Sequence, residues 1–219
     1  MDMRKAVVVL LFAVLVGAGV WYLVHNVALL EDVDSRTTQA TTEPPLPALG
    51  PICGGHCGTE RWEVKTLNDV DREHVRLTPV DATVEGLRML TPTGVAPGRM
   101  RYSPVELTVY RIEAYLGGAF TEDDGDWHLV LFGRKDERAS LIAEIPDPAC
   151  AGACRSGFAA AFGRARQLLE ERLRRPNPRD QPILVRVTGV GFFDRAHGQS
   201  GAAPSQFELH PVLSIEFPD

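Results

Sequence analysis

The sequence predicts a mainly β domain of the OB-fold type, a five-stranded Greek-key barrel with one helix. Three observations lead to this prediction. Three β-type runs precede one amphipathic helical run, two more β-type runs follow it, and the polar part of the chain is long enough for one core. In an OB-fold the helix lies between the third and fourth strands. A small β-sandwich with one helix would give the same order of elements and is the open alternative.

The predicted strands before the helix are rich in β-branched and aromatic residues, and turn signals separate them. The three main ones cover residues 104–116, 127–132 and 139–145. Gly117-Gly118 ends the first, and Asp124-Gly125 is typical of the tight turn of a hairpin. Further upstream, two short strands are expected at residues 62–67 and 83–87.

The helical run begins at Ser156, a residue type that caps helices, and ends before Pro176. Its apolar residues keep a helical spacing and predict one buried face, made of Phe158, Ala161, Phe162, Ala165, Leu168, Leu169 and Leu173. Residues 183–193 and 207–217 then supply the last two strands.

The amino-terminal region contains an unbroken apolar run at residues 6–24. A helix of this length nearly matches the hydrocarbon core of a bilayer, which is about 30 Å thick. Basic residues precede the run and acidic residues follow it, so the positive-inside rule places the rest of the chain outside the cytoplasm. We therefore expect a single-pass anchor in residues 1–30, with a cleaved signal peptide and a secreted protein as the alternative.

Residues 31–52 are rich in Thr, Ala and Pro and lack apolar periodicity, which is typical of a linker. The predicted outer domain then covers residues 53–219. The chain carries a formal net charge of −6, and an acidic protein lacks the field that attracts phosphate backbones. Nucleic acid is therefore an unlikely partner.

The four cysteines form two matched pairs, Cys53 with Cys57 and Cys150 with Cys154, each separated by three residues. Export favours disulfides over a four-sulfur zinc site, which more often uses a spacing of two residues. Bridges between the pairs close much longer loops than bridges within them and stabilise more in the chain-entropy model. We expect Cys57 to pair with Cys150 and Cys53 with Cys154.

Several short motifs together resemble a bacterial family of small exported proteins. The motifs are Glu60-Arg61-Trp62, Val64-Lys65-Thr66, Asp124-x-Asp126-x-His128-Leu129-Val130-Leu131, Ala143-Glu144-Ile145-Pro146, Gly189-Val190-Gly191-Phe192-Phe193-Asp194, His197-Gly198-Gln199 and Glu208-Leu209-His210-Pro211-Val212. The resemblance extends over residues 57–217 and implies a shared domain but no particular reaction. It also implies that Cys57 and Cys150 are the family's usual pair, to which this chain adds Cys53 and Cys154.

The candidate site residues are polar side chains within apolar strands. Alternation along the second and last strands directs Asp126, His128, Glu208 and His210 away from the core. These side chains suit zinc or manganese binding, or acid–base hydrolysis. However, the third strand separates the second from the last by about 10 Å in an OB-fold, so structural hydrogen bonding is the favoured interpretation. The same interpretation applies to Glu144 at the end of the third strand.

The connection formed by residues 194–206 is long, polar and without predicted secondary structure, which is typical of a binding loop. His197, Gln199 and Ser200 are its candidate ligand-binding groups, although a plain surface loop is as plausible. The chain has no nucleotide-binding glycine loop and no hydrolase or zinc-protease motif, so we predict no cofactor and assign no metal. The favoured function is a non-catalytic binding module for an unknown extracytoplasmic ligand or protein. The alternative is a metal-dependent hydrolase or nuclease.

Overall fold

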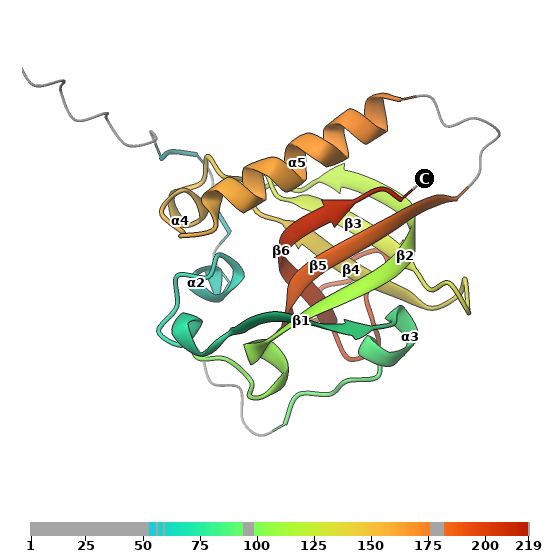
Figure 1. Cartoon of the computed structure of the whole chain (residues 1–219). Coiled ribbons are helices and arrows are strands. Elements are labelled where there is room, and N and C mark those ends of the chain that lie inside the picture. Colours follow the sequence, from blue (N-terminus) through green and yellow to red (C-terminus); the bar gives the residue numbers. More distant parts are fainter. Residues whose placement is uncertain (1–52, 56, 59, 94–98, 176–181, 219) are drawn as a thin grey trace, which may run out of the picture. The chain divides into compact units, whose positions relative to one another are not determined.

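Five strands close into a barrel in the computed structural model, which describes residues 53–55, 57–58, 60–93, 99–175 and 182–218. These strands are β2 (Thr108–Thr121), β3 (Trp127–Phe132), β4 (Ser140–Ile145), β5 (Ile183–Phe193) and β6 (Phe207–Glu216). Neighbouring strands follow the order β2-β3-β4-β6-β5, and β5 pairs with β2 to close the ring. All pairs are antiparallel except β4 with β6 (Figure 1).

This topology is that of the OB-fold, with a helix between the third and fourth barrel strands. The predicted fold class is therefore confirmed. The alternative β-sandwich does not apply, because the strands form one closed sheet and not two packed ones. One part of an edge stays free, because β3 pairs only with residues 115–121 of the long strand β2.

One further strand, β1 (Arg76–Ala82), attaches to this free part of β2 and was not predicted from the sequence. It runs parallel to β2 and pairs with no other strand. Pro79 cannot donate a ladder hydrogen bond, and the register shifts between Arg76 and Val80. An edge position tolerates such a residue, whereas the same residue argues against a strand when only the sequence is considered.

β2 continues past Gly117-Gly118, where the sequence predicted its end. The register of β2 with β3 shifts between Leu116 and Gly118, which marks a bulge in a strongly bent barrel strand. A Cβ atom at Gly117 would overlap the ring of Phe132 on β3. The glycine therefore allows close packing at a bend and does not end the strand.

Both short upstream strands were predicted wrongly, because each segment forms one helical turn. α2 covers Trp62–Lys65, and α3 covers Val84–Leu87. Thr83 caps α3, since its Oγ1 accepts a hydrogen bond from Gly86 N at 3.1 Å. A β-type run can form a strand only beside an available strand edge, and β1 already occupies the part of the β2 edge that β3 leaves free.

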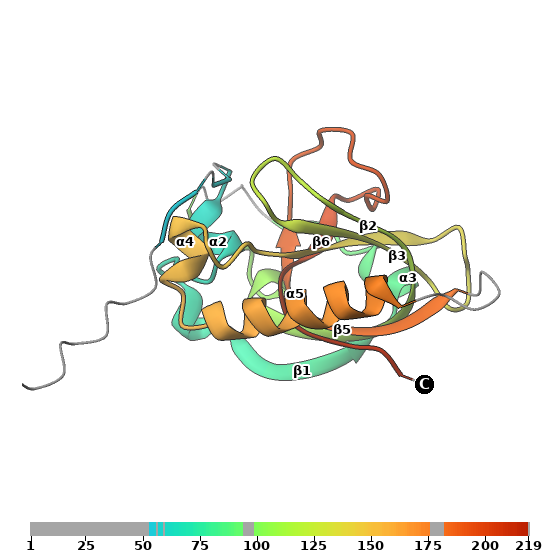
Figure 2. The ribbon, with the colours of Figure 1, turned by 90° about the horizontal axis from the view of Figure 1, so that it is seen from above.

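α5 (Ala159–Arg174) is the predicted helix, and it lies along the barrel beside β6 (Figure 1, Figure 2). Phe162, Ala165 and Leu169 are its buried residues, whereas Leu168 and Leu173 are exposed. Its buried face is therefore narrower than the sequence predicted. Ser156 does not cap it, because the helix begins three residues later; the Ser156 Oγ accepts from Phe158 N in the preceding turn. The expected stop at Pro176 lies outside the described residues.

Two disulfides connect the start of the domain to α4 (Ala151–Cys154), the helical turn that follows β4. Cys53 pairs with Cys154, and Cys57 pairs with Cys150, which confirms the expected pairing. Next to them, a Cβ atom at Gly152 would overlap the indole of Trp62 on α2. The bridges therefore hold α2 and α4 side by side, as Figure 1 shows.

The described residues form one compact unit. The predicted anchor at residues 6–24 and the linker at residues 31–52 lie outside the described residues. Within the part of the chain that the structure describes, no helix is both long enough and apolar enough to cross a membrane.

Candidate functional site

A row of four side chains runs across four adjacent strands of the barrel. Phe120 on β2 pairs in register with His128 on β3, and His128 pairs with Glu144 on β4. Leu209 on β6 is the partner of Ala143 on β4, and the two strands are parallel. The residues that follow them, His210 and Glu144, therefore lie next to each other. Alternation along each strand directs this row away from the barrel interior. The sheet register therefore determines which polar groups meet.

Glu144 links the two histidines of the row. Its Oε1 lies 3.0 Å from His128 Nδ1, and its Oε2 lies 2.9 Å from His210 Nδ1. The sequence argument considered the separation of the second and last strands. It did not consider that a carboxylate on the intervening strand contacts both histidines.

Each histidine also contacts a second glutamate through the same nitrogen. His128 Nδ1 lies 2.9 Å from Glu122 Oε1, and His210 Nδ1 lies 3.2 Å from Glu208 Oε1. The other ring nitrogens also face oxygen atoms. His128 Nε2 lies 3.0 Å from the Ser200 carbonyl oxygen, and His210 Nε2 lies 3.5 Å from Asp126 Oδ2. The two imidazoles are thus surrounded by acceptors.

These groups are buried although they point away from the barrel interior. Asp126, His128 and His210 are fully buried, and Glu144 and Glu208 are 2% exposed. We call these five residues the buried cluster. The sequence placed four of them on an outward face, which the structure confirms. It did not indicate that this face is covered.

The connection between β5 and β6 covers the buried cluster. It lies beside the β2–β3 hairpin in Figure 2, and Gln199 Nε2 donates to Glu122 Oε1 at 3.2 Å and to Glu144 Oε1 at 3.3 Å. The Ser200 carbonyl accepts from His128. His197 is 41% exposed and lies 3.5 Å from Asp194, so it is apart from the cluster. Of the loop candidates, Gln199 and Ser200 touch the cluster and His197 does not.

A pocket of about 560 Å³ opens above Gln199 and Glu122. Other residues that line it are Cys57, Gly58, Glu60, Lys65, Phe120, Thr121, Asp123, Asp124, Asp194, Arg195 and His197. With Glu122, five of the lining side chains are carboxylates, and Lys65 and Arg195 are the lysine and the arginine among them. Glu60 pairs with Arg195 at 3.1 Å and Asp194 with Lys65 at 3.6 Å. The remaining charge in the pocket is therefore negative.

Asp194 has an unusual environment in this pocket. Its side chain is 3% exposed, and neither carboxylate oxygen has a hydrogen-bond partner among the described residues. The Lys65 ammonium at 3.6 Å and His197 Nδ1 at 3.5 Å are its nearest opposite charges. A buried carboxylate normally accepts several hydrogen bonds, so this one has unused acceptor capacity.

The buried cluster shifts the pKa values of its members in opposite directions. Burial raises the pKa of Glu208 to about 7, and the nearby charge of Glu144 adds to this shift. Burial also raises the pKa of Asp126. Burial alone would raise the pKa of Glu144, but hydrogen bonds from both histidines lower it well below its usual value. Glu144 is therefore the permanently ionised centre of the cluster.

The pKa values of the basic groups in and beside the buried cluster are raised. Burial acts to lower the pKa of His210, but contacts with Asp126, Glu144 and Glu208 raise it well above its usual value. The pKa of His128 is likewise raised, against the effect of burial, by its contacts with Glu144 and the Ser200 carbonyl. The surrounding carboxylates raise the pKa of Lys65 despite its burial. The local field therefore favours positive charge at each of these positions.

The same geometry could hold metal ions. Glu122, His128 and Glu144 form one set whose potential ligand atoms all lie within 4.8 Å of one another, and Asp126, Glu144 and His210 form another. Imidazole and carboxylate ligands of this kind suit zinc or manganese.

Sequence reasoning missed several residues of the site: Lys65, Glu122 and Asp194 were not named as candidates, and Glu144 was assigned a structural role. A signal for Glu144 exists in its position opposite His128 in an antiparallel pair. Lys65 comes from α2, a segment predicted as a strand, so its approach to the cluster could not be inferred.

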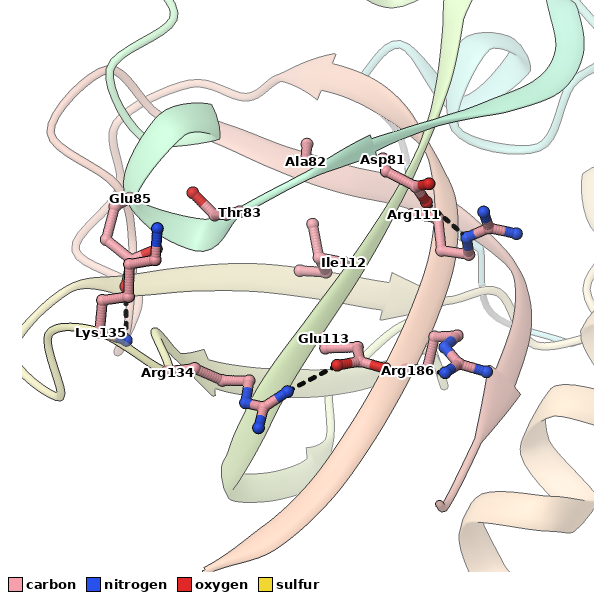
Figure 3. A pocket seen from close by; sticks show the side chains of 10 residues that line it. All are labelled: Asp81, Ala82, Thr83, Glu85, Arg111, Ile112, Glu113, Arg134, Lys135 and Arg186. Carbon is pink, nitrogen blue, oxygen red and sulfur yellow. Dashed lines mark hydrogen bonds and ion pairs between the residues drawn. The ribbon is translucent and has the colours of Figure 1, made fainter.

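A second pocket of about 810 Å³ lies elsewhere on the barrel, between β1, β2, β5 and α3. Figure 3 shows that its charged side chains pair with one another. Arg111 contacts Asp81 at 2.7 Å, and Glu113 bridges Arg134 at 2.6 Å and Arg186 at 2.7 Å. This larger pocket is exposed and largely self-compensated, and it is not our candidate site.

Neither a protein-family model nor a curated protein sequence matches the chain. The functional argument therefore rests on the geometry of the pocket and the buried cluster.

Proposed function

We propose that this protein is an extracytoplasmic, non-catalytic binding module that holds a cationic ligand in the pocket above the buried cluster. The observation that carries the proposal is Asp194, a buried carboxylate that lines the pocket and has no hydrogen-bond donor among the described residues. A positively charged group in the pocket would supply the missing donors.

The other charges of the pocket support the same ligand class. Asp123 and Asp124 line the pocket and have no cationic partner among the described residues. Phe120 is 43% exposed and stacks on His128, with ring centroids 4.6 Å apart. The pocket thus combines an aromatic wall with excess negative charge, and both features attract cations.

We further propose that the domain lies outside the cytoplasm on a single-pass anchor formed by residues 6–24. The two disulfides support an oxidising compartment. If the anchor is uncleaved, the full chain should stay in the membrane fraction after a carbonate wash. A soluble form that begins near Val20 would instead favour cleavage and secretion.

A metal-dependent hydrolase is the second candidate function, favoured by the two ligand sets that share Glu144. Two-metal hydrolases hold their ions close together in a comparable way. The acidic lining of the pocket opposes a phosphodiester substrate, because like charges repel at short range. Binding of a cation is therefore the better supported function.

The test uses three four-carbon probes that differ in charge: putrescine, 1,4-butanediol and succinate. We expect putrescine to raise the Tm of the full chain, whereas the diol and succinate leave it unchanged. Asp194→Asn should abolish the putrescine effect. Asp81→Asn, a matched change in the larger pocket, should preserve it. Stabilisation by succinate but not by putrescine would overturn the proposal.

A further inference from the structure

We propose that the cation is a divalent metal ion, zinc or manganese, bound by Glu122 Oε1, His128 Nδ1 and Glu144 Oε1. This inference rests on the proposed function, that the pocket holds a cation, and assigns a cation to the floor of the pocket without using Asp194. The three residues come from the end of the β2–β3 hairpin, from β3 and from β4, so the rigid barrel holds two of them. The ion would lie at the floor of the pocket, which Glu122 lines.

The spacing of the three atoms fits one metal ion. His128 Nδ1 lies 2.9 Å from Glu122 Oε1 and 3.0 Å from Glu144 Oε1, and all three atoms lie within 4.8 Å of one another. If two ligand atoms each lie about 2.1 Å from an ion, they are about 3.0 Å apart when the angle at the ion is a right angle. They are about 3.4 Å apart when the coordination is tetrahedral. Only small side-chain movements would bring the donors to these positions.

The hydrogen bond on the far side of His128 prepares its Nδ1 for a metal. The Ser200 carbonyl lies 3.0 Å from Nε2, and a carbonyl can only accept, so Nε2 carries a proton. In the neutral imidazole, Nδ1 then has a free lone pair directed at two carboxylates. Metal-bound histidines commonly donate their other ring N–H to a backbone carbonyl in this way.

Gln199 is positioned to complete the ligand set. Its amide lies 3.2 Å from Glu122 Oε1 and 3.3 Å from Glu144 Oε1, where its nitrogen donates to both. Rotation of the amide by half a turn would exchange its nitrogen for its oxygen, which is a metal ligand. The three proposed ligands and the Gln199 amide would leave further coordination positions of the ion open toward the pocket.

The surroundings of the ligand set also contain more carboxylates than cations. Asp126 Oδ2 and His210 Nε2 are buried, face each other at 3.5 Å and have no other partner among the described residues. Five carboxylates lie around the two histidines and Lys65: Asp126, Glu144, Glu208, Glu122 and Asp194. Buried excess charge is costly unless another cation neutralises it. A divalent ion bound at His128 would reduce this excess.

The experiment titrates the untagged, EDTA-treated full chain with Zn²⁺ or Mn²⁺ by calorimetry. We expect one strong site. Glu122→Gln should weaken binding at least about tenfold, the scale known for residues that support a metal site. Glu122 is partly exposed, so this variant should fold. His128→Asn should abolish binding, and His74→Ala, which removes an exposed histidine that does not line the pocket, should leave the affinity unchanged. A Co²⁺ spectrum shows whether an imidazole and oxygen set binds the ion.

Two results would overturn the inference. Equal metal affinity for Glu122→Gln and the unaltered chain would assign the metal to another place. A chain that binds putrescine but neither metal would retain the proposed function and lose the metal assignment. Failure to bind any of these cations would overturn both.

Discussion

Glu144 Oε2 lies 2.9 Å from His210 Nδ1, in a contact between two side chains that are both almost completely buried. Exposed ion pairs contribute little to stability because water competes for each charge. A buried pair behaves differently, since removal of one partner leaves the other charged and without solvent. The consequences of this contact can be measured.

Glu144→Gln should destabilise the domain by roughly 3–5 kcal/mol, because it removes the charge that both buried histidines share. Chemical denaturation gives this difference. Glu113→Gln is the matched control: Glu113 also bridges two cations, Arg134 and Arg186, but it is partly exposed. We expect a loss below about 1 kcal/mol for the control. Equal losses for the two variants would show that the buried cluster has no special role in stability.

His210 and His197, both named in the sequence analysis, should respond differently to truncation. His210→Ala leaves Asp126, Glu144 and Glu208 without their shared partner and should cost about 3 kcal/mol or more. His197→Ala removes an exposed side chain and should change the free energy of unfolding by less than about 0.5 kcal/mol. Thermal melts of both variants test this contrast. A drop of several degrees for His197→Ala would contradict it.

The stability of the metal-free domain should decrease as pH rises from about 5 to 8. Glu208 has a folded pKa of about 7, above the ordinary 4.5, so its stabilising proton is fully present below pH 4.5 and lost as pH rises through 7. The raised pKa values of His128 and His210 act in the same direction, with stability present below pH 6.5 and lost above it. The lowered pKa of Glu144 has the opposite effect, but only in strong acid.

Each pKa unit corresponds to about 1.4 kcal/mol, so the Glu208 shift alone contributes on the order of 3 kcal/mol. The charges that face it come from several elements: Lys65 on α2, Glu144 on β4 and His210 on β6. Melts in EDTA across this pH range provide the measurement, and Glu208→Gln should flatten the curve. A Tm that rises steadily from pH 5 to 8 would refute this assignment of protons.

Loss of the Cys57–Cys150 bridge should cost about 2–5 kcal/mol, as in other small secreted domains. The bridge joins residues 93 positions apart and holds α2, which carries Lys65, beside α4. A double Cys57→Ser and Cys150→Ser variant should therefore unfold at lower denaturant concentration and bind the cation more weakly. Peptide mapping of the parent should recover Cys57 with Cys150 and Cys53 with Cys154.

The sequence by itself determined the order of the barrel strands and the helix, because strand alternation, turn residues and a single amphipathic helix are local signals. Only the pairing of β5 with β2 decided between a barrel and a sandwich. Residues 127–132 and 183–193 were predicted with the bounds that the structure gives. Periodicity also identified which side chains leave the barrel interior, including His128 and His210. The preference for disulfides between the two cysteine pairs followed from the loop lengths that they would close, which depend only on residue numbers, and the structure then showed Cys57 with Cys150 and Cys53 with Cys154.

Tertiary structure alone decided the environment of those outward side chains. Strand register brought Glu144 between His128 and His210, and the β5–β6 connection placed Gln199 and the Ser200 carbonyl over them. No local pattern encodes such meetings, because they depend on the closure of the ring and on contacts between residues far apart in the chain. The alternation of residues along a strand indicates which face of the sheet a side chain is on. Whether it then meets water, a carboxylate or a covering loop depends on the rest of the fold.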